Sequence, residues 1–156
     1  MAFSMDETDI HILSLLQPNA FLTNNELAKK IGLAPSAVLE RIKKLEQKGI
    51  IEGYPTRIKP DALELKLLAF ISVKSSEGPA KDSVAKHLQK IPEVLELHHI
   101  AGEDCYLLKV RTKDPQSLIQ LMREKFKHPN ILSTKTTIVL ETLKETNQLP
   151  IPKPQK

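Results

Sequence analysis

The sequence contains a single cysteine, Cys105, so no disulfide can form within one chain. Few cysteines are typical of proteins kept in a reducing compartment, and we expect a cytoplasmic protein. No apolar run approaches the ~20 residues of a transmembrane helix. The N-terminal MAFSMDETD lacks the basic region and the apolar core of a signal peptide. A Gly-rich phosphate loop is also missing. Because it lacks a long apolar run and a signal peptide, the sequence predicts a protein with no membrane partner.

Metal-ligating and nucleophilic side chains do not form a recognisable set. His98 and His99 are adjacent in a predicted strand, so they point to opposite faces and cannot hold one metal ion together. Cys105 has no CxxC partner and no adjacent histidine, so we expect a buried or half-buried thiol. The remaining histidines are scattered: His11, His87 and His128. We predict no catalytic residue, no cofactor and no metal site, and hence no enzyme.

Charge is distributed unevenly along the first third of the chain. The formal net charge is only +4 over 156 residues. Residues 27–49 hold six basic and two acidic side chains, a local excess of four, whereas residues 5–22 carry acids and no Lys or Arg. The apolar content is sufficient for packed cores. The basic charge of this region is therefore concentrated in one segment, as expected of a surface that meets nucleic acid.

Residues 23–49, TNNELAKKIGLAPSAVLERIKKLEQKG, predict two helices joined by a tight turn. Thr23 and Glu26 have the spacing of a capping box at the start of the first helix. Gly32 breaks this helix. Pro35 fits the first turn of the second helix, where its missing N–H is not needed, and Gly49 is typical of a C-terminal stop.

The second helix has one apolar and one polar face. Val38, Ile42 and Leu45 form an inward stripe, joined by Leu39. A small Ala28 and the turn glycine would let the two helices cross closely, which is the helix-turn-helix arrangement. Its second helix enters the major groove of DNA. The DNA-binding candidates lie on or beside the outward face: Ser36, Ala37, Glu40, Arg41, Lys43 and Lys44. The alternative is an ordinary αα-hairpin with a solvated charged face.

Each candidate has a chemical role that it could perform. Ser36 and Ala37 lie in the first helical turn, where backbone amides and the helix dipole can meet a phosphate. Glu40 could accept a hydrogen bond from cytosine, and Arg41 or Lys44 could donate to guanine or phosphate. Phosphate contacts are expected of the lysines around them, for which a solvated position is the alternative: Lys29, Lys30, Lys43 and Lys48.

The flanking segments complete an N-terminal domain over residues 1–53. A helix capped by Asp6 makes it a three-helix unit. The run IIEGY after Gly49 suits the strand of a wing or an exit from the unit. Residues 54–66, bounded by Pro55 and Pro60, are predicted to form a connecting strand and hinge. Residues 146–156 form a Pro-rich tail that we expect to be extended.

Residues 67–145 show a different periodicity, in which β-type runs alternate with two helical segments in the order β-α-β-β-α-β. This order predicts a ferredoxin-like domain, a four-stranded antiparallel sheet with its helices on one face. The protein is thus predicted to be α+β, a (winged) helix-turn-helix domain followed by a ferredoxin-like domain. We expect the open face of the sheet to be covered by dimerisation, with Leu67, Ala69 and Ile71 or their alternates as its apolar side chains.

A second candidate site is the turn between the two central strands, formed by Gly102, Glu103, Asp104, Cys105 and Tyr106. Glycine permits a tight turn. The adjacent carboxylates could receive the α-amino group of an amino acid while nearby N–H groups receive its carboxylate. A plain hairpin turn with no ligand is the alternative.

Taken in order, these segments resemble the Lrp/AsnC, or feast/famine, family of prokaryotic transcriptional regulators. The resemblance extends from about Met5 to Pro150 and rests on DETDIHIL, ELAKKIGLAPSAVLERIKKLEQKGIIEGY, LLAFISV, PEVLELHHIAGEDCYLLKVR and TTIVLETLKET. It implies a regulator that binds double-stranded DNA, dimerises through its C-terminal domain and assembles into larger rings such as an octamer. It also implies an amino-acid effector held in a cleft at the turn 102–106, with Thr134 and Thr136 as its far wall.

Two positions depart from the family pattern. Ala34 stands where members commonly place a serine that caps the recognition helix, and Cys105 stands where many have aspartate. Some proteins of this architecture are enzymes that act on tetrapyrroles, notably siroheme decarboxylases. The basic residues retained on the second helix argue against that alternative. A third possibility is an assembly partner that forms rings with another regulator and binds DNA weakly alone.

Overall fold

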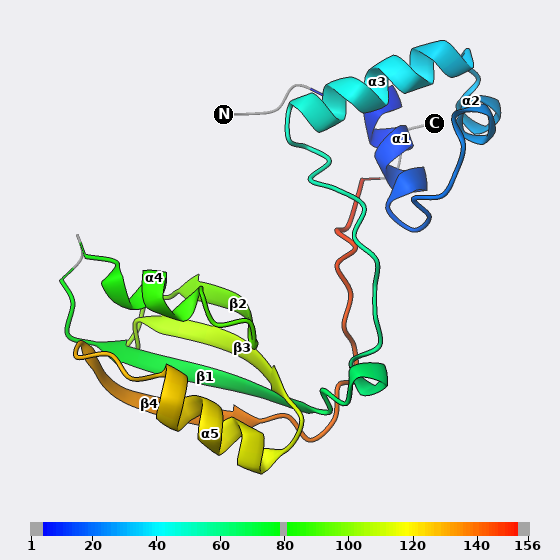
Figure 1. Ribbon diagram of the computed structural model, residues 1–156. Helices are drawn as coiled ribbons and strands as arrows, with labels where there is room; N and C mark the ends of the chain where they lie inside the picture. The colour runs from blue at the N-terminus through cyan, green and yellow to red at the C-terminus, as the bar shows by residue number, and fades with distance from the viewer. Residues whose placement is uncertain (1–4, 79–80, 153–156) are drawn as a thin grey trace. The chain divides into compact units, whose positions relative to one another are not determined.

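The protein, as a computed structural model, is described here for residues 5–78 and 81–152 (Figure 1). It divides into two compact units. The first contains residues 1–56 together with 144–156, and the second contains residues 57–143. The Pro-rich tail thus groups with the N-terminal helices.

The first unit contains three helices: α1 (Glu7–Leu16), α2 (Asn24–Ile31) and α3 (Pro35–Gln47). Capping boxes begin α1 and α2. Asp6 accepts a hydrogen bond from the amide of Asp9, and Thr23 accepts one from the amide of Glu26, while each of these acids reaches back to the cap residue. Such caps satisfy N–H groups that have no partner inside the helix, so they fix where the helix begins. Both predicted caps are confirmed.

The three helices enclose a small apolar core. Its buried members come from all three helices: Ile12, Leu16, Leu27, Ala28, Val38, Ile42 and Leu45. Gly32, at φ +81°, occupies the left-handed region at the end of α2 and allows the tight turn into α3. The predicted inward stripe of α3 is confirmed except for Leu39. That side chain is 38% exposed, because it lies on the solvent side of the buried stripe.

The chain that follows α3 contains no strand between residues 50 and 66, a stretch that the structure describes throughout. The predicted connecting strand is therefore wrong, and of the two alternatives for IIEGY the structure has the exit from the unit and not the wing strand. A strand needs a neighbour for its backbone groups, and Gly53 and Pro55 are both poor ladder residues. A short 3₁₀ helix, η1 (Pro60–Leu63), is present instead. Tyr54 donates a hydrogen bond to Glu46 (2.9 Å) and ties the exit segment to α3. Burial, and then Glu46, raises the pKa of Tyr54 to about 12.

The second unit has the predicted β-α-β-β-α-β order. Its elements are β1 (Leu67–Ser75), α4 (Ser83–Leu88), β2 (Val94–His99), β3 (Tyr106–Thr112), α5 (Pro115–Lys125) and β4 (Ile131–Ile138). The strands are antiparallel and lie in the order β2-β3-β1-β4. Asp114 caps α5 by accepting from the amide of Ser117, with Pro115 at the first helical position. The predicted ferredoxin-like fold is confirmed.

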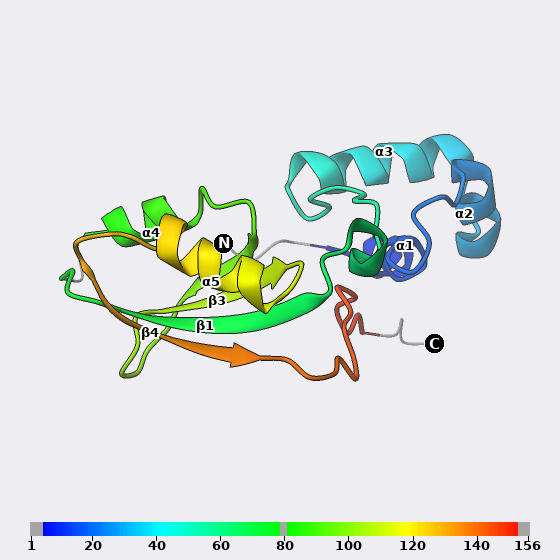
Figure 2. The same cartoon turned by 60° about the horizontal axis from the view of Figure 1, so that its bottom comes forward.

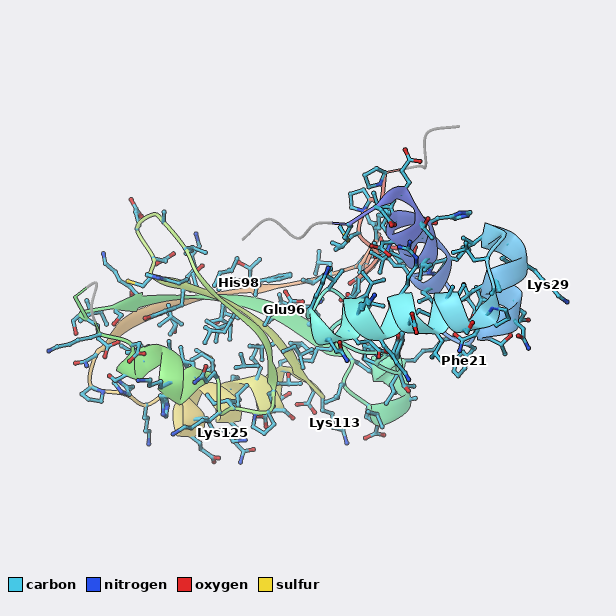
Figure 3. The ribbon with its side chains drawn as sticks, turned by 90° about the horizontal axis from the view of Figure 1, so that it is seen from above. Phe21, Lys29, Glu96, His98, Lys113 and Lys125 are labelled. Atoms are coloured by element: carbon cyan, nitrogen blue, oxygen red, sulfur yellow. The ribbon has the colours of Figure 1, made fainter. Side chains whose placement is uncertain are left out.

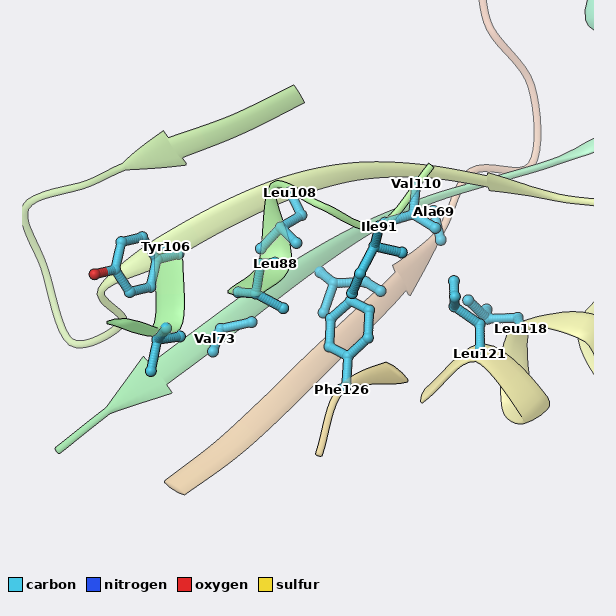
Figure 4. Packing of buried hydrophobic residues seen from close by; sticks show 12 residues of the cluster. Ala69, Val73, Leu88, Ile91, Tyr106, Leu108, Val110, Leu118, Leu121 and Phe126 are labelled. Carbon is cyan, nitrogen blue, oxygen red and sulfur yellow. The ribbon is translucent and has the colours of Figure 1, made fainter. Parts of the chain in front are cut away.

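Both helices of this unit cover the same face of the sheet (Figure 2). Ala69, Ile71 and Val73 of β1 are fully buried there and pack with apolar residues of α4 and α5 (Figure 4). Because strand side chains alternate, the neighbouring Leu68 and Phe70 lie on the opposite face, where Leu68 is only 6% exposed and Phe70 is half-buried. The apolar side chains of the open face therefore come from the alternating residues Leu68 and Phe70, and not from Ala69 and Ile71.

Within residues 5–78 and 81–152, no helix is long and apolar enough to cross a membrane. These residues also contain no cluster of three or more His, Cys, Asp or Glu side chains arranged to hold a metal ion.

Candidate nucleic-acid interface and ligand-binding turn

Helix α3 presents most of its predicted DNA-binding residues to solvent. Ser36, Glu40, Lys43 and Lys44 are exposed, whereas Ala37 is half-buried. The opposite side of the helix is held in the core of the first unit. Of the flanking lysines, Lys29 points outward from α2 (Figure 3). The exposed side of α3 thus carries two cations and one carboxylate on a rigid element.

The start of α3 has no side-chain cap. Ala34 occupies the cap position in an extended conformation and makes no side-chain hydrogen bond, and Pro35 follows at the first helical position. A serine or threonine cap is worth about 1 kcal/mol of helix stability. The expected loss of the cap at Ala34 is confirmed. Because Ala34 supplies no side-chain acceptor, the first-turn amides can meet an external anion.

Arg41 differs from the other candidates because its guanidinium is engaged within the unit. Its Nη1 donates to Asp6 Oδ2 at 2.6 Å and to Asp9 Oδ1 at 2.8 Å. The Asp9 side chain is only 16% exposed and that of Arg41 33%. These hydrogen bonds raise the pKa of Arg41. The pKa of Asp6 is lowered, first by the amide of Asp9 and then by Arg41. The contacts join the start of α1 to the middle of α3.

We expect Asp9→Asn and Arg41→Ala each to weaken DNA binding by about threefold, with little further loss in the double variant, since each change weakens the same charged contact between α1 and α3 while their shared apolar core remains. Stability should fall by about 1 kcal/mol or less because water partly screens the pair. The measurement is a DNA titration at several salt concentrations, with Glu7→Gln as the control on α1. If Arg41 contacted phosphate instead, its loss would lower the salt slope by about one and Asp9→Asn would strengthen binding.

The predicted ligand-binding turn connects β2 to β3. The Ile100 amide donates to the Cys105 carbonyl (2.9 Å), and the Cys105 amide donates to the Val73 carbonyl (2.9 Å). Gly102 has φ +153°, a conformation that favours glycine. Gly102 and Glu103 are exposed, Asp104 and Cys105 half-buried, and Tyr106 buried. Glu103 therefore lies at the exposed outer end of the turn, and Asp104 lies between it and the inner end, which is fixed to β1.

Cys105 lies against the end of β1. Its sulfur accepts from the Ser75 amide at 3.4 Å and lies 3.7 Å from the Ser75 carbonyl oxygen, to which the thiol donates. The thiol is half-buried, as predicted. These contacts give Cys105 a structural role. An ionised aspartate at this position could accept from the Ser75 amide but could not donate to the Ser75 carbonyl.

Sheet register relates the turn to the two candidate threonines. Tyr106 pairs with Val73, and Val73 pairs with Thr134, so the three residues form one row across β3, β1 and β4. Thr136 pairs with Ile71 in a neighbouring row. Both threonines are exposed on the helix-covered face. Tyr106 on β3 and Thr134 on β4 are separated by two strand spacings, about 10 Å, because β1 lies between them. Thr134 and Thr136 therefore do not contact the turn within one chain.

The turn borders a hollow that the sequence did not reveal. Its volume is about 40 Å³, and its lining residues come from the end of β1, the loop after it, β2 and the turn: Ser75, Glu77, Gly78, Lys81, His99, Cys105 and Tyr106. Ligand pockets usually have about 300 Å³ or more. At about 40 Å³, this hollow alone is too small to enclose an amino acid.

The electrostatics of the hollow centre on Glu77. Hydrogen bonds from the Ser83 hydroxyl, the Val84 amide and the Asn130 side chain lower the pKa of its carboxyl, with Ser83 the largest cause. Burial, and then the charge of Glu77, raises the pKa of Tyr106. The hollow therefore combines a carboxylate, a neutral phenol, a histidine and the Lys81 ammonium, groups able to meet both ends of a zwitterion.

Two family models match successive parts of the chain. Residues 5–52 match the "Winged helix-turn-helix DNA-binding" model. Residues 68–149 match the "Lrp/AsnC ligand binding domain" model. The chain belongs to the Lrp/AsnC family. Its prediction as a DNA-binding transcriptional regulator is confirmed, although the segment matched by the winged model has no wing strand in this structure.

Relatives with this family's architecture match nearly the whole chain. The leucine-responsive regulatory protein of Escherichia coli strain K12 is 34% identical over 150 residues, covering 94% of this chain and 92% of its own length. A transcriptional regulator of Neisseria meningitidis, solved with L-Met, has a TM-score of 0.87 at 35% identity and covers 94% of this chain and 97% of its own. A Mycobacterium tuberculosis feast or famine regulatory protein, complexed with L-methionine, has a TM-score of 0.87 at 32% identity, with 96% and 100% covered.

Proposed function

We propose that the exposed side of α3 enters the major groove of double-stranded DNA and recognises operator sites there. The observation that carries this proposal is the solvent exposure of Glu40, Lys43 and Lys44 on a helix whose other side is packed into a core. The lysines meet phosphates or guanine, and Glu40 accepts from cytosine. The first-turn amides near Ser36 and Ala37 meet a phosphate. Arg41 orients α3 through Asp9.

An amino acid is the effector that we propose for the C-terminal domain. Relatives are named leucine-responsive or were solved with L-methionine. The turn from Gly102 to Tyr106 supplies carboxylates and backbone N–H groups that suit a zwitterion. Since the hollow beside the turn holds only about 40 Å³, a second chain completes the site. Thr134 and Thr136 line its far wall from that second chain.

We also propose that the protein self-associates. The open face of the sheet pairs with its counterpart on another copy to form a dimer, and dimers assemble into a ring such as an octamer. We propose a cytoplasmic regulator with no catalytic activity, in line with relatives that are named as transcriptional regulators.

Genome-wide DNA occupancy, measured with and without amino acids in the medium, tests the function. We expect enrichment at promoter regions and a change in occupancy when amino acids are added. A variant with Glu103→Gln and Asp104→Asn should occupy the same sites without responding. Occupancy no higher than background would reject DNA recognition. A response to amino acids that the variant retains in full would reject the turn as the effector site.

A further inference from the structure

The C-terminal tail belongs to the same compact unit as the three helices. After β4 the chain crosses the unit boundary at residues 143–144 and returns to the N-terminal unit (Figure 1). The chain also crosses between residues 56 and 57. Two chain segments therefore run between the units. The second of them joins the units only while the tail is bound to the helices.

Gln17, at the end of α1, binds the tail through its side-chain amide. Its Nε2 donates to the Leu149 carbonyl at 2.7 Å, and its Oε1 accepts from the Leu149 amide at 2.9 Å. The amide side chain has one acceptor and two donors in a plane, so it satisfies both backbone groups of Leu149 as a neighbouring strand would. Gln17 is itself anchored, because its backbone amide donates to the Leu13 carbonyl.

The sequence of the tail suits docking in an extended form. Pro150 and Pro152 flank Ile151, and proline restricts the backbone before any contact is made. Docking a restricted segment costs less conformational entropy than docking a flexible one. The Leu149 side chain is 72% exposed, whereas Ile151 is half-buried. The backbone of Leu149, rather than its exposed side chain, therefore makes the attachment.

We propose that the Gln17 end of α1 is a docking site for an extended peptide, and that its occupant is this chain's own segment 149–151. Occupancy within one chain is favoured because the covalent connection gives the tail an effective concentration of about millimolar. The docked tail is a second tether on the DNA-binding helices, and residues 139–148 connect it to the end of β4. Its release would leave residues 57–66 as the remaining connection between the units.

Backbone hydrogen exchange of the full-length protein, followed by NMR, tests the docking. In the wild type we expect the Leu149 amide to exchange about tenfold or more slowly than an open chain, and Gln17→Ala should remove this protection. Gln148→Ala, a change of the same kind on the tail itself, should retain it. The amide of Gln17 reports whether α1 remains folded in each variant. Equal exchange of Leu149 in wild type and Gln17→Ala would overturn the proposal.

A second variant approaches the contact from the other side. Truncation after Gln148 leaves α1 unaltered, so the Gln17 side-chain amide resonances should shift without loss of the helix. Leu149 protection that rises with protein concentration would show the tail docking on another copy, which overturns occupancy within one chain. Side-chain resonances that are unchanged by the truncation would overturn the docking site as well.

Discussion

Replacing Lys43 and Lys44 together by glutamine is expected to weaken DNA binding by about tenfold to a hundredfold and to lower the slope of log affinity against log salt by about two. Both ammonium groups lie on the exposed side of α3. Each phosphate contact releases condensed counterions, so each lost contact removes about one unit of slope. The measurement is a fluorescence titration with promoter DNA between low and physiological salt.

The control for this variant removes the same charge from the other unit. Lys90 and Lys127 are exposed lysines of the second unit, and replacing both by glutamine changes the net charge equally. If binding depended only on net charge, both double variants would lose affinity to the same extent. That outcome, or an unchanged salt slope in the Lys43 and Lys44 variant, would contradict the assignment of α3 as the DNA-binding helix.

Local sequence signals predicted the element boundaries well because the interactions that set them are local. The capping boxes at Asp6 and Thr23 and the turn at Gly32 each involve residues within four positions of one another. The β-α-β-β-α-β order followed from periodicity in the same way. The prediction of a wing strand, one of two alternatives, was wrong because a strand depends on residues that are distant in the sequence. A strand is stabilised by a partner that its own sequence does not specify, and IIEGY has none among the described residues.

Contacts between distant positions were missed. Asp9 and Arg41 are 32 residues apart, and Gln17 and Leu149 are 132 apart. Arg41 was predicted to contact DNA because its position on the helix borders the exposed face, and nothing local indicates that two carboxylates of α1 engage it. The acids of α1 were noted only as a region without basic residues. The available signal was the combination of Arg41 at the border of the exposed face with the acidic start of α1. Together they could have indicated an ion pair between the two helices.

The ligand-binding turn was predicted from residue type, whereas the surrounding wall was not. Glu77, Lys81 and His99 border the same hollow as Tyr106, although they come from a loop and a strand that carry no motif. Only the pairing of β1 with β3 brings Ser75 beside Cys105. The small volume of the hollow has a further consequence, because an amino-acid site would then depend on assembly. Effector binding and self-association should be thermodynamically linked.

Phe70→Glu is expected to give a folded monomer in place of the dimer or larger assembly that we propose for the wild type. Phe70 lies on the open face in the central strand β1, between Lys109 of β3 and Thr137 of β4. In a monomer the new carboxylate remains solvated, whereas in a face-to-face dimer it would be buried at a cost of several kcal/mol, enough to weaken association by about a hundredfold or more. Light scattering after size-exclusion chromatography measures the mass, and circular dichroism checks the fold.

Phe21→Glu is the matched control for this variant, since Phe21 is 95% exposed in the first unit and the chemical change is identical. It should retain the wild-type mass. The Phe70→Glu monomer should also bind an operator with two half-sites much more weakly, because the two recognition helices would no longer be held at a fixed spacing. A Phe70→Glu protein with the wild-type mass would show that copies associate through another surface. The assignment of the open face to the dimer would then be wrong even if DNA binding through α3 were retained.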